Sequence, residues 1–315
     1  MEQYKTELLR LLEKIESSIL NKEETTKTVL LLGKKLNSIR NQLSKNEWKE
    51  VIQNYCQTHS LNDLLLQDPF TRRAFTKPRN YAGDAVMMDY VYAADGTIKS
   101  PSFENETELG KSIFPYIMEL TASRAVRSRR KGIAERLEQL VQNSVQPDVL
   151  AVACGHLREV ELSPSAIQGR IGRYIALDQD IESLAVVEND YRSYGIEPYH
   201  GSVREILNKK ADLPEFDFIY SLGLYDYLEE RVAQKLTERL FNKLKPGGIL
   251  HIANFHPNDE TSAFIEAFCD WWLIYRNEAE MENLLKLIPS NDIQSRKTFF
   301  YENPSIIYLE IQKIG

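Results

Sequence analysis

Two residues near the middle of the chain have the types and spacing of a nucleotide-recognition site. Gly155 follows the apolar run PDVLAVA, and a glycine lets a ligand approach the backbone without a steric clash. Asp178 closes the next apolar run, RYIALD, 23 residues further along the chain. In strand–helix–strand units an acidic side chain at such a distance accepts hydrogen bonds from ribose hydroxyls. The spacing therefore predicts a ribose-binding carboxylate at Asp178.

The elements that position these residues are predicted to alternate between strands and helices. From residue 147 onward the apolar runs are PDVLAVA, RYIALD, EPYHG, FDFIYSL and GILHIANF, and helical segments span residues 159–167, 181–194, 203–208 and 229–244. This alternation is typical of a parallel sheet with helices on both faces. After a helical insert with Phe264 and Phe268, the sequences RKTFFY, ENPS and IIYLEIQK predict a terminal hairpin.

The residues before 147 follow a helical period. Apolar residues three or four positions apart predict amphipathic helices around residues 8–19 and 29–43, joined near residues 21–26. A third helical run surrounds Trp48, and Ser60 is expected to N-cap a fourth helix that stops at Asp68-Pro69. These segments predict a helical N-terminal region.

The stretch that follows is harder to assign. Residues 72–96 contain punctuating Pro and Gly residues among aromatic ones, and their periodicity predicts no element, although the mixture suits a lining segment. One long helix with an irregularity at Pro115 is expected from about residue 106 to 142. Its basic run RSRRK, residues 127–131, is predicted to be a solvated helix face.

Composition excludes several functions. The chain has 315 residues, with 39 Lys and Arg against 46 Asp and Glu. Its formal net charge of −7 argues against a protein whose main function is to bind nucleic-acid phosphates. Three scattered cysteines and five histidines without a pair at ligand spacing argue against a disulfide framework or a metal site. The N-terminal residues have neither a signal-peptide core nor a membrane span. We therefore expect a cytoplasmic protein that binds neither nucleic acid nor metal.

The second half resembles the class I S-adenosylmethionine-dependent methyltransferases in the order of its motifs. VACGHLRE ends the first apolar run, ALDQD the second, HGSV follows the third, YSLGLYDYL ends the fourth, and LKPGG precedes the fifth. The resemblance implies an α/β fold class, a Rossmann-like seven-stranded methyltransferase sheet with an N-terminal helical cap. We expect residues 1–105 to form the cap, which selects the substrate, and residues 106–315 the catalytic domain, with 106–146 as a connecting helix.

A narrower group resembles residues 70–315 more closely, the extracellular-factor 3-hydroxypalmitic acid methyl ester biosynthesis proteins. Their segments KPRGYAGD, GLFDYL and WxLIYR are similar to KPRNYAGD at 77–84, GLYDYL at 223–228 and WLIYR at 272–276. Asn80 and Tyr225 depart from that pattern, and Ala153 and Leu157 replace the flanking glycines of the usual three-glycine loop.

The resemblance implies S-adenosylmethionine as cofactor. It assigns cofactor binding to residues at or just after the ends of four of the predicted strands: Ala153, Cys154, Gly155, His156, Asp178, Gln179, Ser202, Val203, Ser221, Leu222 and Gly223. Cys154 is expected to be a small apolar filler rather than a nucleophile. Glu159, just after the loop, is expected to hold the loop in position rather than to contact the cofactor.

Methyl transfer from a sulfonium is an in-line displacement that depends mainly on alignment and exclusion of water. A carboxylate acceptor is already ionised at neutral pH and needs only orientation, whereas an amine or guanidine needs a carboxylate to accept its proton. The candidates for catalysis are Tyr81, Asp84, Tyr225 and Asp226. The candidates for substrate binding are Arg79, Tyr92, Tyr227, Asn254, His256, Tyr275 and Arg276.

Each candidate also has a structural interpretation. The tyrosines suit buried rings with bonded hydroxyls, and Asp84 suits the closing residue of a turn after Gly83. The resemblance implies methylation of a small or lipid-like metabolite, with a carboxylate acceptor favoured and an amine or guanidine of a natural-product pathway as the alternative. A nicotinamide dehydrogenase lacks support because ACGHLR is not GxGxxG. A non-catalytic cofactor-binding regulator or scaffold also stays open, as does a homodimer formed through the N-terminal helices.

Overall fold

The computed structural model describes residues 2–21, 25–99, 101 and 106–315, and the middle of the loop predicted at residues 21–26 lies outside this set. The described chain divides into two compact units. One comprises residues up to 127 together with 259–272, and the other comprises residues 128–258 and 273–315. We call them the helical unit and the sheet unit. Residues 106–127 and 259–272 thus cluster with the N-terminal helices, so the helical unit extends beyond the expected cap at 1–105.

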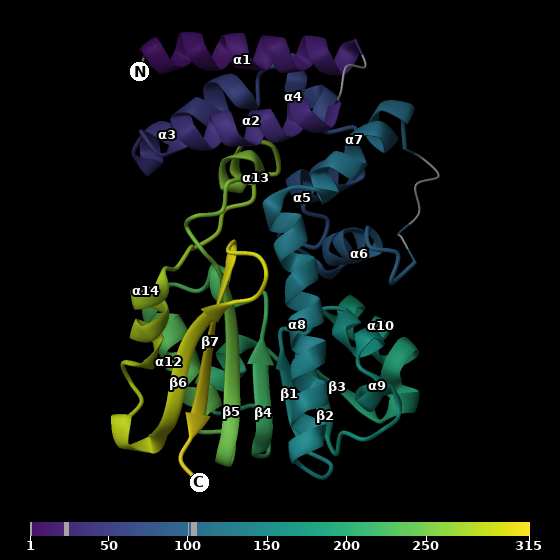
Figure 1. Ribbon diagram of the computed structural model, residues 1–315, viewed down its shortest axis with the longest axis vertical. Coiled ribbons are helices and arrows are strands. Elements are labelled where there is room, and N and C mark those ends of the chain that lie inside the picture. Colours follow the sequence, from purple (N-terminus) through teal and green to yellow (C-terminus); the bar gives the residue numbers. More distant parts are fainter. Residues whose placement is uncertain (1, 22–24, 100, 102–105) are drawn as a thin grey trace. The chain divides into compact units, whose positions relative to one another are not determined.

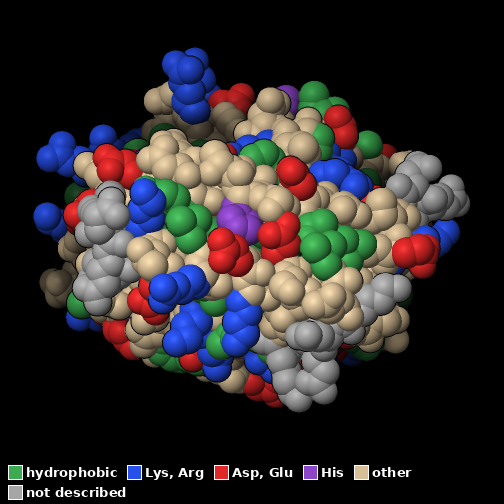
Figure 2. All heavy atoms as spheres, turned by 90° about the horizontal axis from the view of Figure 1, so that it is seen from above, with side chains coloured by type: hydrophobic (Ala, Val, Ile, Leu, Met, Phe, Trp, Pro, Cys, Tyr) green, Lys and Arg blue, Asp and Glu red, His purple; other side chains and the backbone are tan. Residues whose placement is uncertain are grey.

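The helical unit is built from short and medium helices. They are α1 (Glu2–Leu20), α2 (Thr25–Arg40), α3 (Lys45–Val51), the π-helical turn η1 (Ile52–Cys56), α4 (Ser60–Leu65), α5 (Pro69–Thr76), α6 (Ala85–Ala93), α7 (Glu108–Met118) and α13 (Ser262–Phe268). The predicted amphipathic pattern is confirmed, because Leu8, Leu12 and Ile15 of α1 and Leu32 and Leu36 of α2 are buried. Figure 2 shows the face on which α1 lies, where acidic and basic side chains are interspersed.

Several boundaries in this unit differ from the predictions. His59, not Ser60, N-caps α4, because its Nδ1 accepts the N–H of Leu61 over 3.1 Å. The single helix expected over 106–142 is wrong, since α7 ends at Met118 and α8 (Thr121–Asn143) begins anew. Helix α6 has no amphipathic period because it buries residues around most of its circumference, which explains why the pattern predicts no helix there.

The sheet unit confirms the predicted α/β fold class. The described residues form a seven-stranded sheet in the order β3-β2-β1-β4-β5-β7-β6 (Figure 1). Strands β1 to β5 are parallel, and β7 is antiparallel to both β5 and β6. The strands are β1 (Val149–Val152), β2 (Tyr174–Asp178), β3 (Ile196–His200), β4 (Phe216–Ser221), β5 (Leu244–Phe255), β6 (Ile293–Phe300) and β7 (Ile306–Lys313). The five predicted parallel strands and the terminal hairpin are therefore present.

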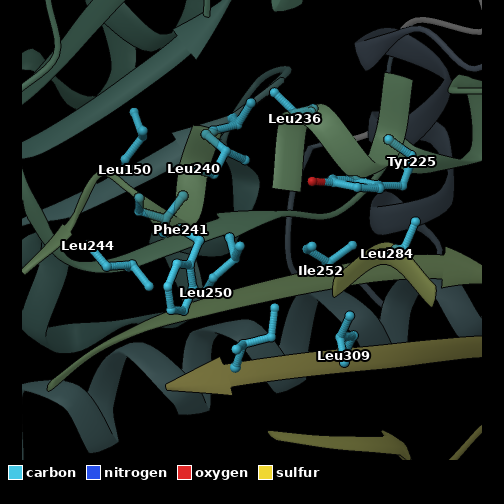
Figure 3. Close-up of a cluster of buried hydrophobic side chains, with 14 of the residues drawn as sticks. Leu150, Tyr225, Leu236, Leu240, Phe241, Leu244, Leu250, Ile252, Leu284 and Leu309 are labelled. Carbon is cyan, nitrogen blue, oxygen red and sulfur yellow. The ribbon is translucent and has the colours of Figure 1, made fainter. Parts of the chain in front are cut away.

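Helices cover both faces of this sheet. The remaining elements of the unit are η2 (Arg158–Leu162), α9 (Pro164–Ile167), α10 (Ile181–Tyr191), η3 (Arg192–Tyr194), α11 (Val203–Leu207), η4 (Tyr225–Tyr227), α12 (Glu230–Phe241), α14 (Glu278–Glu282), η5 (Asn283–Leu285) and η6 (Ser290–Asp292). Ile133 and Leu137 of α8 pack with Val187 of α10 against one face. Leu236 and Leu240 of α12 pack against the other, as Figure 3 shows.

Candidate functional site

The candidate site lies at the carboxyl ends of the parallel strands β1, β2 and β4. β1 pairs with β2 on one side and with β4 on the other, so the strand order reverses between β1 and β4. Ligands of open α/β sheets bind in the crevice at such a reversal, beyond the carboxyl ends of the strands. The loop after β1, the end of β2 and the turn after β4 therefore define the site.

The loop after β1 adopts left-handed backbone conformations at alternate residues. Ala153, Gly155 and Leu157 have φ angles of 54°, 55° and 53°. This conformation costs a non-glycine residue about 1–2 kcal/mol because its Cβ crowds a carbonyl oxygen. Leu157 is 1% exposed within the core below the loop, so burial of its side chain offsets the cost. Replacement of the two flanking glycines therefore does not prevent the conformation that glycine favours.

Asp178 joins this loop to the end of β2. Its Oδ2 accepts the backbone N–H of Gly155 over 2.8 Å, and its Oδ1 accepts that of Asp180 over 2.9 Å. Burial raises the pKa of Asp178, while these N–H donors act in the opposite direction. A carboxylate offers about four acceptor positions, so Asp178 can also accept bonds from ribose hydroxyls. The predicted spacing of Gly155 and Asp178 thus corresponds to a direct contact.

The neighbouring cofactor candidates differ in exposure. Burial, together with the charges of Asp178 and Glu159, raises the pKa of the Cys154 thiol well above its ordinary value, so the thiol stays protonated. His156 is buried and Gln179 is exposed. Ile181, which the motif analysis missed, is an exposed apolar side chain at the start of α10, 68% exposed.

Ser202 and Val203 begin helix α11. The Ser202 hydroxyl donates to Glu205 Oε2 over 2.8 Å and accepts the Glu205 N–H, which forms a capping box. Val203 is half-buried and packs against the core on the α12 face of the sheet. Local capping therefore accounts for the Ser202 hydroxyl, and cofactor contact by these residues stays a prediction.

The end of β4 is tied to β1 and to α8. Ser221 is buried, and its hydroxyl donates to the carbonyl of Val152 over 3.1 Å. The carbonyl of Leu222 accepts a bond from the Arg129 guanidinium over 2.5 Å. Gly223 is exposed. The Ser221 hydroxyl therefore links β4 to β1. Leu222 and Gly223 form the part of the turn that solvent can reach.

Two of the predicted catalytic residues, Tyr225 and Asp226, lie in the turn η4. Tyr225 is 0% exposed, its hydroxyl bonds Thr237 Oγ1 over 3.0 Å, and its ring lies among core side chains (Figure 3). This placement is a correction to the predicted catalytic role of Tyr225, because a ligand has no access to the ring. Asp226 is also buried, and its Oδ1 accepts the backbone N–H of Phe255 over 2.6 Å. Tyr227 is 40% exposed and is the η4 residue most open to a substrate.

Arg276 and Asn254 hold the turn in place. The Arg276 guanidinium, 4% exposed, donates to the carbonyls of Tyr225 and Leu228 and to Asn254 Oδ1 over 2.5–2.7 Å. Asn254 Nδ2 donates to the carbonyl of Ile274 over 2.8 Å. These bonds engage both side chains internally, so the structure places them as braces of the turn. Their predicted substrate contacts are not supported by this placement.

The last two candidates of the sheet unit are His256 and Tyr275. His256 is buried, its Nδ1 accepts the N–H of Asn258, and its ring lies edge-on to Phe300 with centroids 5.2 Å apart. Tyr275 is half-buried. Substrate binding by either residue stays a prediction.

The remaining candidates belong to the helical unit. Asp84 is fully buried, N-caps α6 through the Met87 N–H over 2.9 Å, and pairs with the Arg73 guanidinium at 2.7 Å. Tyr92 is buried, and Arg79 and Tyr81 are half-buried. The structural interpretation of Asp84 as a residue that closes a turn is thus well supported. Substrate contacts by the other three residues stay predictions.

Helix α8 carries two buried cations that the sequence pattern did not predict. Arg129 and Arg130 are 5% and 1% exposed, so the predicted solvated face at residues 127–131 is wrong for both. Arg130 donates to the carbonyl of Arg158 over 2.8 Å and pairs with Glu161 at 2.9 Å. The signal was present, because Val126 and Ile133 place residues 129 and 130 on the apolar face of the helix.

Comparisons with known proteins show the fold. A possible exported protein from Bordetella parapertussis is 13% identical with a TM-score of 0.59, covering 87% of this chain and 100% of that one. The N-methyltransferase NodS from Bradyrhizobium japonicum with bound S-adenosylhomocysteine is 14% identical with a TM-score of 0.42, covering 59% and 87%. Magnesium protoporphyrin IX methyltransferase from Synechocystis, also with bound S-adenosylhomocysteine, is 13% identical with a TM-score of 0.49, covering 76% and 99%.

At 13% identity and a TM-score of 0.59, the likeness to the Bordetella protein is one of fold. No protein-family model matches the chain, and no curated protein sequence matches it. Among the described residues, no helix has the length and apolar character to span a membrane, and no group of three or more His, Cys, Asp or Glu side chains is arranged to hold a metal ion.

Proposed function

We propose that the chain is an S-adenosylmethionine-dependent methyltransferase whose donor binds at the end of β1, β2 and β4. The observation that carries the proposal is the contact between Gly155 and Asp178 at the point where the strand order reverses. The left-handed loop would receive the amino-acid end of the donor, and Asp178 would accept bonds from the ribose. Ile181 and Val203 offer apolar surface for the adenine.

We further propose a carboxylate on a small or lipid-like metabolite as the methyl acceptor. A carboxylate needs no base, and the predicted bases are engaged elsewhere, Asp226 with the Phe255 N–H and Asp84 with Arg73. This favours O-methylation over the alternative of an amine or guanidine acceptor. Tyr227, exposed on η4, is then a candidate for orienting the acceptor.

Calorimetric titration tests the donor site. We expect the purified chain to bind S-adenosylhomocysteine and not NAD. Binding of NAD with no affinity for S-adenosylhomocysteine would contradict the proposal. A chain that binds S-adenosylhomocysteine but transfers no methyl group to any component of a cell extract would favour a cofactor-binding regulator.

The chemistry of the product tests the acceptor. After incubation of the enzyme with methyl-labelled donor and a cell extract, mass spectrometry identifies metabolites that gain one methyl group. A methyl ester releases labelled methanol in mild alkali, whereas an N-methyl product does not. Retention of the label after alkaline treatment would contradict the carboxylate acceptor and favour the amine or guanidine.

A further inference from the structure

Glu159 carries a buried carboxylate that packs with the β1 loop. Its side chain is 4% exposed, and it follows by two residues Leu157, which has the last left-handed backbone of the loop. Leu157 and Cys154 pack in the hydrophobic cluster that also contains Tyr174 and Tyr220. The Glu159 carboxylate reaches into this cluster, because its Oε1 accepts the Tyr220 hydroxyl over 2.6 Å.

This bond places the carboxylate where the strand order reverses. Tyr220 of β4 lies opposite Ala151 of β1 in the sheet. The next residue, Ser221, ends β4 and bonds the Val152 carbonyl, the last of β1. Glu159 therefore lies beside the carboxyl ends of the two strands between which the order reverses. The proposed donor site occupies the crevice at the same strand ends.

The hydrogen bonds of Glu159 have the lengths typical of an ionised carboxylate. The Tyr174 hydroxyl lies 2.5 Å from that of Tyr220, which lies 2.6 Å from Glu159 Oε1. Hydrogen bonds from a hydroxyl to an ionised oxygen are about 2.5–2.7 Å long. A hydroxyl has one proton, so Tyr220 donates to Glu159 and accepts the proton of Tyr174. The two phenols thus form a chain that ends at the carboxylate.

Glu159 lacks a counter-ion of its own. Within the part of the chain that the structure describes, no Lys, Arg or His side chain forms an ion pair with it. Burial raises its pKa and outweighs its hydrogen bonds and the charges of Arg130 and Arg129. Arg130 pairs instead with Glu161 at 2.9 Å, and Arg129 bonds a backbone carbonyl of the β4 turn. A buried charge is costly without a partner, so this position favours a ligand that brings a positive charge.

We propose that Glu159 recognises the positive charge of the methyl donor, and that it favours the sulfonium donor relative to the neutral thioether product. The inference rests on the proposed function for the identity of the donor. In the transfer, the acceptor oxygen bonds the methyl carbon as the carbon–sulfur bond breaks, and the electron pair of that bond stays on sulfur. The sulfonium charge disappears in this step, so the attraction to Glu159 disappears with it. The carboxylate thereby favours replacement of the product by fresh donor.

The test is calorimetric titration of Glu159→Gln and the wild type at pH 8 with three probes. S-adenosylmethionine and sinefungin are cationic, since a protonated amine replaces the sulfonium in sinefungin, whereas S-adenosylhomocysteine lacks this charge. Glutamine removes the charge of Glu159, yet its amide oxygen can still accept the Tyr220 hydroxyl. We expect the affinity for both cationic probes to fall by about fivefold or more relative to that for S-adenosylhomocysteine.

Two further variants separate charge from structure. Glu159→Asp keeps the charge but is too short to keep the bond with Tyr220, so it should retain the wild-type preference for the cationic probes. A purely structural Glu159 would give the reverse, with Glu159→Gln like the wild type and Glu159→Asp impaired equally for all three probes. Glu188→Gln, which removes an exposed charge from α10, is the matched control and should leave the preference unchanged.

The outcomes distinguish this inference from the proposed function. If the wild type binds none of the three probes, the proposed function fails and the role of Glu159 fails with it. If the wild type binds them but Glu159→Gln loses affinity for all three equally, or for none, only the present inference is overturned.

Should Glu159→Gln fail to fold, the double variant Glu159→Met/Tyr220→Phe replaces it, because it leaves no unpaired hydroxyl at position 220. A loss of the preference for the cationic probes in this variant supports the inference, and an unchanged preference contradicts it. A double variant that also fails to fold contradicts it as well, because Glu159 would then serve the fold.

Discussion

Gly155 donates its backbone N–H to Asp178 Oδ2 over 2.8 Å, which joins the loop after β1 to the end of β2. The same carboxylate accepts the Asp180 N–H at the start of α10. One side chain thus sets the geometry of two elements that flank the candidate donor site. This relationship means that a substitution of Asp178 changes both the scaffold and the surface offered to a ligand.

We predict that Asp178→Ala weakens binding of S-adenosylhomocysteine at least tenfold, because a hydrogen bond to a charged acceptor contributes about 1.5–3 kcal/mol. The variant also leaves the Gly155 and Asp180 N–H groups without this acceptor, so loss of affinity alone does not prove ribose contact. Calorimetry with analogues that lack one ribose hydroxyl separates the effects. At least one analogue should bind the wild type more weakly than S-adenosylhomocysteine does, whereas Asp178→Ala should bind that analogue and S-adenosylhomocysteine with equal affinity. If Asp178→Ala still binds every analogue more weakly than S-adenosylhomocysteine, by the same factor as the wild type, the ribose contact is excluded.

Ala153→Gly should stabilise the fold by up to about 1.5 kcal/mol. The φ of 54° strains alanine by about 1–2 kcal/mol, and relief of this strain exceeds the roughly 0.5–1 kcal/mol entropic cost of a glycine. Ala151→Gly, two residues earlier in the extended strand β1, is the matched control and should destabilise. Chemical denaturation measures both free energies of unfolding. Equal destabilisation by both substitutions would show that position 153 is not strained.

Asp84→Asn is expected to lower stability by about 1–3 kcal/mol while retaining most of the turnover. Asparagine still caps α6, but it loses the buried pair with Arg73. Arg73→Met breaks the same pair from the other side and should have a similar effect on the thermal midpoint. Complete loss of turnover in a folded Asp84→Asn, with activity preserved in Arg73→Met, would restore the catalytic role that the motif predicts.

Glu310 should make the fold sensitive to acid. Burial raises its pKa, but the bond with His251 and the charge of Arg136 outweigh burial and lower the pKa from 4.5 to about 2. A carboxyl with a lowered pKa stabilises the folded state above the unfolded value, and that stability is lost as the pH falls from about 4.5 to about 2. The lowering corresponds to roughly 3 kcal/mol.

Glu310→Gln is therefore expected to unfold more easily at pH 7 and to lose less stability than the wild type between pH 4.5 and 2. Urea denaturation at several pH values measures this difference. Glu302→Gln, at an exposed position near the start of β7, provides the control. If Glu310→Gln and the wild type show parallel acid profiles, the ion pairs with Arg136 and Lys297 do not stabilise the carboxylate.

Local pattern accounts for much of the fold. The parallel strands and the terminal hairpin were predictable because buried strands are short apolar runs separated by turn residues and amphipathic helices. The boundaries at His59 and between α7 and α8 were not, since they depend on which side chain reaches a free N–H and where a helix meets its neighbours. Helix α6 escaped prediction because burial on several sides removes the period.

The same division applies to the candidate site. The sequence alone determined that a glycine and an acidic residue would lie where two successive parallel strands end, because each residue ends or follows a short apolar run and a helical segment separates the two runs. The hydrogen bond between Gly155 and Asp178 depends on the pairing of β1 with β2. Tertiary structure decided that Tyr225 is buried, that Ala153 and Leu157 take left-handed conformations, and that Arg129 lies beside the β4 turn. These outcomes depend on packing and charge between segments far apart in the chain, and no local spacing encodes them.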